Sequence, residues 1–337
     1  MAEKTVLLAH GGGGTLMRDL LADVVVKELT NPILSKLDDS AVLSLAGQGR
    51  IAFTTDSYVV KPIFFRGGDI GRLAVCGTVN DLAMSGAQPK FISLAFIIEE
   101  GLPLDDLRRI VQSVKQAAQE AEVAIVTGDT KVVEKGGADR IFINTAGIGL
   151  LPEGVDISAS NAQPGDVVLL SGFIGDHGVA IMSEREGIAF ETPVSSDVAP
   201  LGKLVSAMLK ASQRIHCLKD PTRGGVAAAL NEFASASKVG IRVCEDKLPI
   251  RPEVRGACDM LGFDPLYVAN EGKLLAVCHP ADAQAVLAAM RATAYGEQAQ
   301  IIGEVSAEKP GLVVLRTAIG GTRIVDWPYG EQLPRIC

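Results

Sequence analysis

The sequence predicts a protein of two layered domains that each mix helices and strands, an α/β (α+β) fold class. Its 337 residues are enough for two domains at roughly 100–200 residues each. Hydrophobic residues make up 47% of the chain but aromatic residues only 4%. The cores must therefore be built from Val, Leu, Ile and Ala, as in many layered α/β proteins. Segments of helical and of strand character alternate in both halves, which favours layered mixed domains.

The first half is expected to contain two helices and four strands. Apolar residues recur at helical spacing in 15–29 and in 104–122, which predicts a helix over each range. Asn31-Pro32 ends the first helix, and Asp105 and Asp106 favour the first turn of the second. Strands are expected where β-branched or large apolar residues gather, at 51–54, 90–98, 122–127 and 140–150.

A segment rich in Pro, Gly, Ser, Asn and Asp, 152–165, separates the two halves and predicts a domain boundary. The expected parts are a first domain over 1–155, a second over 156–327 and a mobile tail over 328–337. The same patterns predict strands of the second domain at 166–171, 273–278 and 311–316. They predict its helices at 201–213, 224–238, 252–261 and 281–293.

Charge, hydropathy and motif content exclude several classes of protein. The net charge of −8 without a basic stripe argues against a nucleic-acid partner. The longest apolar runs, such as 91–98, are too short to cross a bilayer, so we expect a cytoplasmic protein with no membrane partner. None of the six Cys forms a CxxC pair, which disfavours a zinc knuckle. The sequence also lacks GxxxxGK[ST], GxGxxG and GxSxG motifs.

Aspartates in turn-like contexts are the strongest sign of a metal site. They stand in five short segments, at Asp38-Asp39, Asp56, Asp81, Asp129 and Asp220. Carboxylates at strand ends can converge on Mg²⁺, a hard ion that prefers oxygen ligands and often bridges nucleotide phosphates. Such a site would bind ATP without a Walker loop. The alternative is that each Asp forms a turn or caps a helix.

Four other features each have two interpretations. The segment Asp220–Gly225 opens a predicted helix, whose free amides would suit a phosphate, or it is only a capped turn. Glu271 is either a base or a surface charge. The run Gly11–Gly14 is either a hinge or an anion-binding backbone nest. The final residue, Cys337, is either an exposed thiol that takes part in the function or a terminal Cys without a role.

Taken together, the motifs closely resemble those of the HypE family of hydrogenase maturation factors, the carbamoyl dehydratases. They are HGGGG, FTTDSYVVKPIFFRGGDIGRLAVCGTVNDLAMSGA, TGDTKVV, DPTRGG, NEGK and the terminal PRIC. The middle motifs occur across the wider superfamily of aminoimidazole ribonucleotide synthetase, selenophosphate synthetase and thiamine-monophosphate kinase. The terminal PRIC singles out this family, and the resemblance covers the whole chain.

The resemblance implies a fold, a reaction and partners. The fold is aminoimidazole ribonucleotide synthetase-like, with an N-terminal domain that forms a β-barrel across a homodimer and a larger C-terminal α/β domain. ATP and Mg²⁺ bind between the domains. The carbamoyltransferase HypF loads a carbamoyl group onto Cys337, and the protein uses ATP to dehydrate it to a thiocyanate. The cyano group then passes to iron in the HypC–HypD complex and becomes a cyanide ligand of NiFe hydrogenase.

The resemblance also implies roles for single residues. The implied catalytic residues are Cys337, Lys131 and Glu271. The implied ligands of Mg²⁺ and phosphate are Asp39, Asp56, Asp81 and Asp129. Further nucleotide contacts are implied for Asn80, Asp220, Gly224 and Gly225. Two alternatives stay open: a superfamily kinase or synthetase that acts on a free small molecule, and a non-catalytic adaptor whose tail is a peptide ligand.

Overall fold

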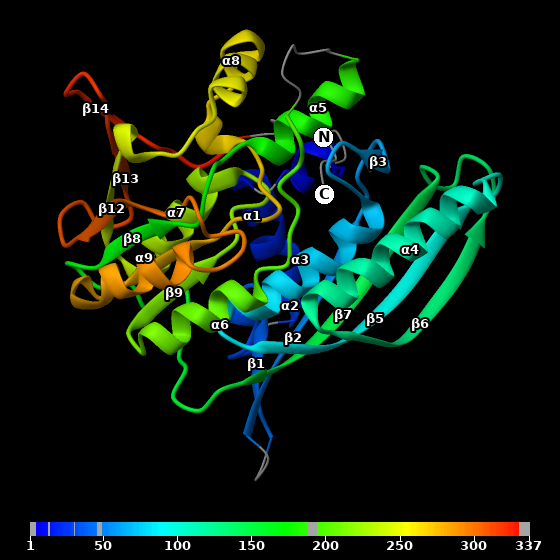
Figure 1. The fold of residues 1–337 in the computed structure, drawn as a ribbon, viewed down its shortest axis with the longest axis horizontal. Coiled ribbons are helices and arrows are strands. Elements are labelled where there is room, and N and C mark those ends of the chain that lie inside the picture. Colours follow the sequence, from blue (N-terminus) through cyan, green and yellow to red (C-terminus); the bar gives the residue numbers. More distant parts are fainter. Residues whose placement is uncertain (1–4, 13, 30, 46–48, 188–193, 330–337) are drawn as a thin grey trace.

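The computed structural model describes residues 5–12, 14–29, 31–45, 49–187 and 194–329. These residues form two large sheets, each with its own helices, lying side by side (Figure 1). This confirms the expected layered α/β architecture. No helix in the described ranges is both long and apolar enough to cross a membrane. The connection between the two sheets, 152–166, contains the predicted boundary at 155, whose position stays a prediction.

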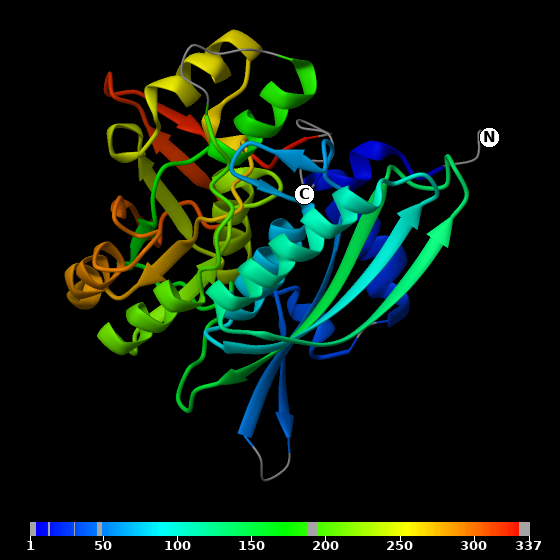
Figure 2. The ribbon, with the colours of Figure 1, turned by 45° about the vertical axis from the view of Figure 1, so that its right-hand side comes forward.

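The first domain is built on a five-stranded sheet in the order β1-β2-β7-β5-β6. Its strands are β1 (Ala41–Leu45), β2 (Gly49–Tyr58), β5 (Gln88–Glu99), β6 (Ala124–Val133) and β7 (Ile141–Leu151). Two helices, α3 (Ile70–Met84) and α4 (Leu104–Ala121), cover the face turned toward the second domain (Figure 2). A short hairpin of β3 (Phe64–Phe65) and β4 (Gly68–Asp69) leads into α3. Asp69 caps that helix by accepting the amide hydrogens of Gly71 and Arg72.

The second domain is built on a seven-stranded sheet in the order β14-β13-β10-β12-β8-β11-β9. Its strands are β8 (Val167–Leu170), β9 (Ile215–Lys219), β10 (Gly240–Cys244), β11 (Leu275–Cys278), β12 (Gln300–Ser306), β13 (Val313–Arg316) and β14 (Thr322–Ile324). Helix α7 (Gly225–Ser237) packs on one face of the sheet. Helices α6 (Gly202–Ala211) and α9 (Ala283–Arg291) pack on the other. Helices α5 (Asp176–Glu186) and α8 (Pro252–Leu261) share a smaller apolar cluster.

Helix α3 joins the two domains, because its residues belong to both cores. Leu73 and Val79 pack in the core of the first domain. Ala83 and Met84, at the end of the same helix, belong to the apolar cluster of the second domain, which α3 meets at α6 and β9. A helix that is buried on nearly every side needs apolar residues all round, and thirteen of its residues are buried.

The chain begins with a helical segment that lies apart from both cores. It comprises η1 (Leu8–Gly11), α1 (Thr15–Leu20), η2 (Leu21–Val26) and α2 (Lys27–Leu29), followed by η3 (Leu34–Lys36). Several of its apolar side chains, including Val24 and Leu29, are exposed. The helix predicted over 15–29 is therefore present, with a wider π-helical turn in its middle.

The prediction that aspartates stand in turns is wrong for three of them, which lie in a helix or in strands. Asp81 lies inside α3, a helix that the sequence patterns did not predict because it lacks an amphipathic period. Asp56 lies inside β2, which runs to Tyr58 rather than ending at 54. Asp129 lies inside β6, which runs to Val133 rather than ending at 127. The expected strands were too short because polar residues interrupt the apolar run in both.

Candidate functional site

An open cleft of about 960 Å³ lies between the two domains. Its walls come from the start of the chain, β1 and β2, α3, the connection between β9 and α7, and the segment before β11. The predicted site residues that line it are Asp39, Asp56, Asp81, Asp220, Gly225 and Glu271. The structure thus brings together predicted residues from five separate parts of the chain.

Three carboxylates form a cluster in this cleft. Asp39, Asp81 and Asp220 each offer an oxygen within 4.8 Å of the others. The hydroxyl of Thr54 lies 2.9 Å from Asp81 Oδ2 and 3.0 Å from the Asp39 carbonyl oxygen, which ties two of the three segments together. Burial, followed by the charge of Asp220, raises the pKa of Asp81 well above its usual range. Burial, followed by the charge of Asp39, raises the pKa of Asp220 to about 7.

Such a cluster is suited to a cation. Crowded, buried carboxylates repel one another and hold protons that a cation would displace. Hard divalent ions prefer carboxylate oxygens. The residue set therefore fits Mg²⁺.

A lysine that no sequence pattern indicated completes the cluster. Lys219, the last residue of β9, contacts Asp39 and lies 2.9 Å from Glu232 Oε2. Burial alone would lower its pKa, but the charges of Asp39 and Glu232 outweigh burial and raise it well above the usual value. The sequence feature that could have identified Lys219 is its position, immediately before Asp220, the first residue of the DPTRGG motif.

Asp56 lies beside the cluster rather than in it. Its Oδ1 accepts the amide hydrogen of Ser57 at 2.7 Å. Burial raises the pKa of Asp56, and the positive charge of Arg223 partly opposes that effect. Asp56 thus adds a further acidic group to the same cleft, together with a nearby guanidinium.

Glu271 is buried, which makes the surface interpretation wrong. Its side chain reaches the cleft although the residue is only 3% exposed. Its Oε1 has no hydrogen-bond partner within the described part of the chain. Burial raises the pKa of Glu271 well above its usual range, and the charges of Asp220 and Asp197 raise it further. A carboxyl in this state can hold a proton in the cleft and accept one after losing it.

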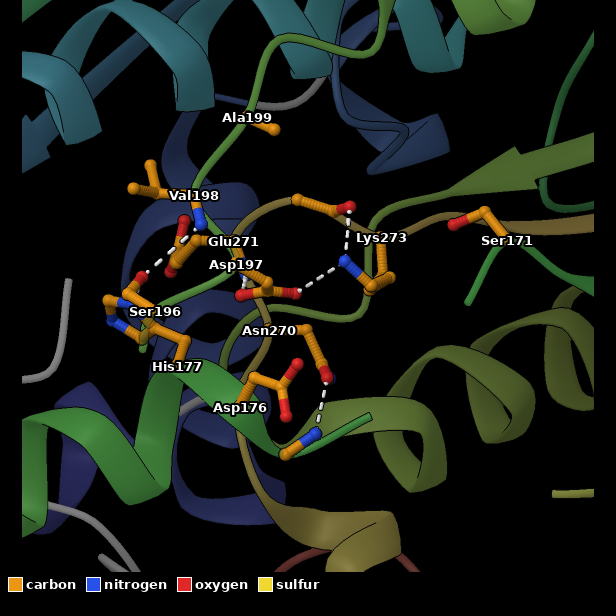
Figure 3. Close-up of polar contacts among 12 residues, drawn as sticks. Ser171, Asp176, His177, Ser196, Asp197, Val198, Ala199, Asn270, Glu271 and Lys273 are labelled. Carbon is orange, nitrogen blue, oxygen red and sulfur yellow. Dashed lines mark hydrogen bonds and ion pairs between the residues drawn. The ribbon is translucent and has the colours of Figure 1, made fainter. Parts of the chain in front are cut away.

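A buried polar network holds Glu271 in place (Figure 3). Its amide nitrogen donates to Asp197 Oδ1 at 3.0 Å, and Lys273 Nζ lies 3.2 Å from Asp197 Oδ2. The neighbouring Asn270 accepts the amide hydrogen of Gly175 at 2.8 Å. Main-chain and side-chain bonds therefore orient the whole NEGK segment.

The glycines of the DPTRGG motif allow close packing at the start of α7. Gly225 has a φ of +62°, and a Cβ there would lie 2.6 Å from the carbonyl oxygens of Leu266 and Val268. Gly224 precedes it as the N-cap with a φ of 77°. Only glycine fits such positions without strain. The helix predicted from Asp220–Gly225 is therefore present, with its N-terminus at the cleft.

Asn80, Asp129 and Lys131 are not among the residues that line the cleft of the single chain. Asn80 is buried, and its amide bonds to the carbonyl of Ala199 at 3.0 Å and to the amide hydrogen of Leu201 at 2.8 Å. Asp129 and Lys131 form an exposed ion pair of 2.6 Å on β6. β7 and β5 separate β6 from β2, which at roughly 4.8 Å per strand places the pair about 14 Å from β2. Cys337 lies outside the described residues.

Strand β6 forms an apolar edge of its sheet in the part of the chain that the structure describes. It hydrogen-bonds to β5 on one side and ends the sheet on the other. Val126 and Val132 are 58% and 68% exposed. An exposed apolar edge is a ready template for pairing with another strand.

Family models match both domains. The model described as AIR synthase related protein, N-terminal domain, matches residues 37–151. The model described as AIR synthase related protein, C-terminal domain, matches residues 163–315. With an acidic cleft between two such domains, the chain is an AIR synthase related protein.

Relatives that match over nearly the whole chain show which family of AIR synthase related proteins this chain belongs to. The carbamoyl dehydratase HypE of Rhizobium leguminosarum bv. viciae is 53% identical, over 100% of this chain and 96% of that protein. The carbamoyl dehydratase HypE of Escherichia coli (strain K12) is 46% identical, over 98% of this chain and 99% of that protein. The chain belongs to the HypE family of carbamoyl dehydratases, and it is an enzyme of that family.

Solved structures agree with this assignment. A HypE–HypF complex contains a chain with a TM-score of 0.88 and 52% identity, covering 92% of this chain and 99% of that one. A structure of HypE in complex with ATP has a TM-score of 0.83 and 48% identity, covering 99% of this chain and 100% of that one. A thiamine-monophosphate kinase bound to AMPPCP and TMP is only 21% identical at a TM-score of 0.71, which shows a shared fold alone.

Proposed function

We propose that this chain uses ATP to dehydrate an S-carbamoyl group on Cys337 to a thiocyanate, which supplies the cyanide ligands of the NiFe hydrogenase iron centre. The observation that carries the proposal is the cleft that joins the Asp39, Asp81 and Asp220 cluster to the buried carboxyl of Glu271. A nucleotide would bring its phosphates to the cluster and leave Glu271 facing the reacting group. The HypE family assignment and the ATP complex of a relative support the same reading.

The residues of the cluster would hold Mg²⁺. Asp39, Asp81 and Asp220 are the proposed ligands, with Asp56 as a further acidic neighbour. Bound Mg²⁺ would neutralise charge on the transferring phosphoryl group. Lys219, already in contact with Asp39, adds a fixed positive charge to the same wall of the cleft.

The proposed chemistry has two stages. The carbamoyl oxygen attacks the γ-phosphorus of ATP, ADP leaves, and one N–H proton is released. Loss of the second N–H proton then forms the C≡N bond as the C–O bond breaks and phosphate departs. Glu271 is suited to take a proton, because a base with a raised pKa transfers protons efficiently near neutral pH.

We further propose that the protein acts as a homodimer and that Asp129 and Lys131 serve the cleft of the second copy. Both lie on the exposed edge strand β6, away from the cleft of their own chain. Pairing of β6 edges would cover the apolar side chains there and bring the ion pair to a partner. Lys131 would then polarise the carbamoyl oxygen.

The proposed partners follow from the same reaction. HypF would load the carbamoyl group, as the solved HypE–HypF complex of a relative supports. The iron-carrying HypC–HypD complex would accept the cyano group.

Mass spectrometry tests the proposal. After incubation with carbamoyl phosphate, ATP and HypF, the protein should carry a carbamoyl adduct and then a cyano adduct at Cys337. Cys337→Ala should carry neither, while Cys244→Ala, at a partly exposed described cysteine, should carry both. Adducts on Cys337→Ala would refute the acceptor assignment. ATP turnover without any adduct would favour a kinase or synthetase, and no phosphate release at all would favour an adaptor.

A further inference from the structure

The start of the chain contacts the base of the C-terminal tail at the rim of the cleft. The amide of Thr15 donates to the carbonyl oxygen of Pro328 at 3.1 Å. Gly14 is buried at this contact. Figure 2 shows the red C-terminal segment running from the second domain toward the dark-blue N-terminal helices. The contact therefore joins the two ends of the described chain.

Gly14 is required by this contact and not by its backbone conformation. Its φ of −106° and ψ of −155° are extended values that any residue adopts. A Cβ on Gly14, however, would lie 2.8 Å from the carbonyl carbon of Pro328 and 3.2 Å from its Cβ. By contrast, a Cβ on Gly11 of the same glycine run would meet no atom of the described residues within 4 Å. Gly11 and Gly14, two of the four glycines in the HGGGG motif, thus have different roles.

A second contact lies one helical turn further on. The guanidinium of Arg18 stacks on the ring of Trp327, 4.4 Å from its centroid. Such cation–π pairs are stabilising, and both side chains line the cleft. Trp327 is therefore held directly beside the proposed nucleotide site.

The second domain holds the other side of the same segment. Asn231 of α7 donates to the carbonyl of Val325 at 3.0 Å. The hydroxyl of Tyr267 donates to the carbonyl of Asp326 at 3.0 Å. The segment 325–328 is thus fixed between the second domain and the N-terminal helix, immediately before the residues that lead to Cys337.

We propose that Gly14, Arg18 and Trp327 form a tail anchor that positions the C-terminal thiol for the dehydration step. The proposal rests on the proposed function of Cys337. With Pro328 held at the rim, a chain of nine residues can span at most about 30 Å, which sets the greatest distance between the anchor and the thiol. Holding a reactant near its site raises its effective concentration. Gly14, Arg18 and Trp327 are positioning residues, because they act through the tail and not on the reacting atoms.

The contact itself can be tested without the reaction, because Trp327 is the only Trp in the sequence. Intrinsic fluorescence therefore reports on the anchor alone. Gly14→Ala and Arg18→Ala should shift the emission to longer wavelength and make it more accessible to iodide. Gly11→Ala and Arg109→Ala, which removes a cation–π pair with Phe64 on the first domain, should leave the emission unchanged. Equal spectra for Gly14→Ala and Gly11→Ala would overturn the anchor.

The positioning role is tested on protein already carbamoylated by HypF. We expect Gly14→Ala to slow thiocyanate formation roughly tenfold, since small displacements of a reacting group cost large factors in rate. The KM for ATP should not change, and Trp327→Phe, which retains an aromatic ring, should react faster than Trp327→Ala. The positioning role would be overturned if Gly14→Ala formed thiocyanate as fast as Gly11→Ala. It would also be overturned if Gly14→Ala raised the KM for ATP and left kcat unchanged. A wild-type protein without any adduct would instead refute the proposed function, while the fluorescence result would still decide on the contact.

Discussion

Replacing Lys219 by Met should destabilise the protein through the charges that it leaves behind. The side chain of Lys219 is only 17% exposed, and it contacts Asp39, whose side chain is 14% exposed. Met keeps an unbranched apolar stem of similar length but removes the ammonium group. Asp39 and Glu232, the two carboxylates that Lys219 contacts, would then lose the cation that neutralises them.

Two estimates of the cost agree. Removing one partner of a buried ion pair costs about 3–5 kcal/mol. The alternative is that the carboxylate left behind takes up a proton. For an ordinary aspartate at pH 7 this costs about 4 kcal/mol, so protonation would not spare the variant the loss of stability. At about 2–4 °C per kcal/mol for domains of this size, the melting temperature should fall by roughly 10 °C.

Scanning calorimetry with EDTA and with Mg²⁺ measures this effect. Lys203→Met is the matched control, because Lys203 forms an ion pair with Glu122 whose two side chains are exposed and therefore screened by solvent. Mg²⁺ should raise the melting temperature of Lys219→Met more than that of the wild type, since a divalent cation replaces the lost charge. Equal melting of Lys219→Met and Lys203→Met in EDTA would refute the reasoning.

Three further predictions concern the base, pH and assembly. Glu271→Gln should bind ATP normally in calorimetry but lose dehydration at least about 100-fold; a near-normal single-turnover rate would contradict its role. Burial raises the pKa of Asp176 from 3.8 to about 6, so its contribution to stability is full below about pH 4 and is lost as the pH rises to about 6. Urea unfolding should therefore find Asp176→Asn more stable relative to wild type at pH 8 than at pH 4, by up to about 3 kcal/mol, and a pH-independent difference would count against this shift. Val132→Glu, on the exposed β6 edge, should give monomers in light scattering, whereas Ile319→Glu, at a side chain 96% exposed in the second domain, should leave the dimer intact.

Local patterns predicted many of the elements but not the helix that joins the domains. The apolar spacing in 104–122 predicted α4 almost to the residue, because one face of that helix is buried and the other is solvated. The same reasoning could not find α3. It is buried on nearly all sides, so its sequence carries no period that distinguishes a helix from a buried strand. Asp81 was therefore expected in a turn, although its role in a carboxylate site was inferred from its chemistry.

Local sequence patterns were enough to predict the class of the two domains, the aspartates from which a metal site could be built, and the motifs shared with one enzyme family. Which of those groups share a cleft depends on how the two domains pack together. Asp39, Asp81 and Asp220 meet because α3 is docked between the domains and β9 ends beside it, whereas the strand order places Asp129 at the far edge of the sheet. Burial in that cleft also raises the pKa of Glu271. Desolvation and the distances between charges depend on segments far apart in the chain, and no local pattern encodes them.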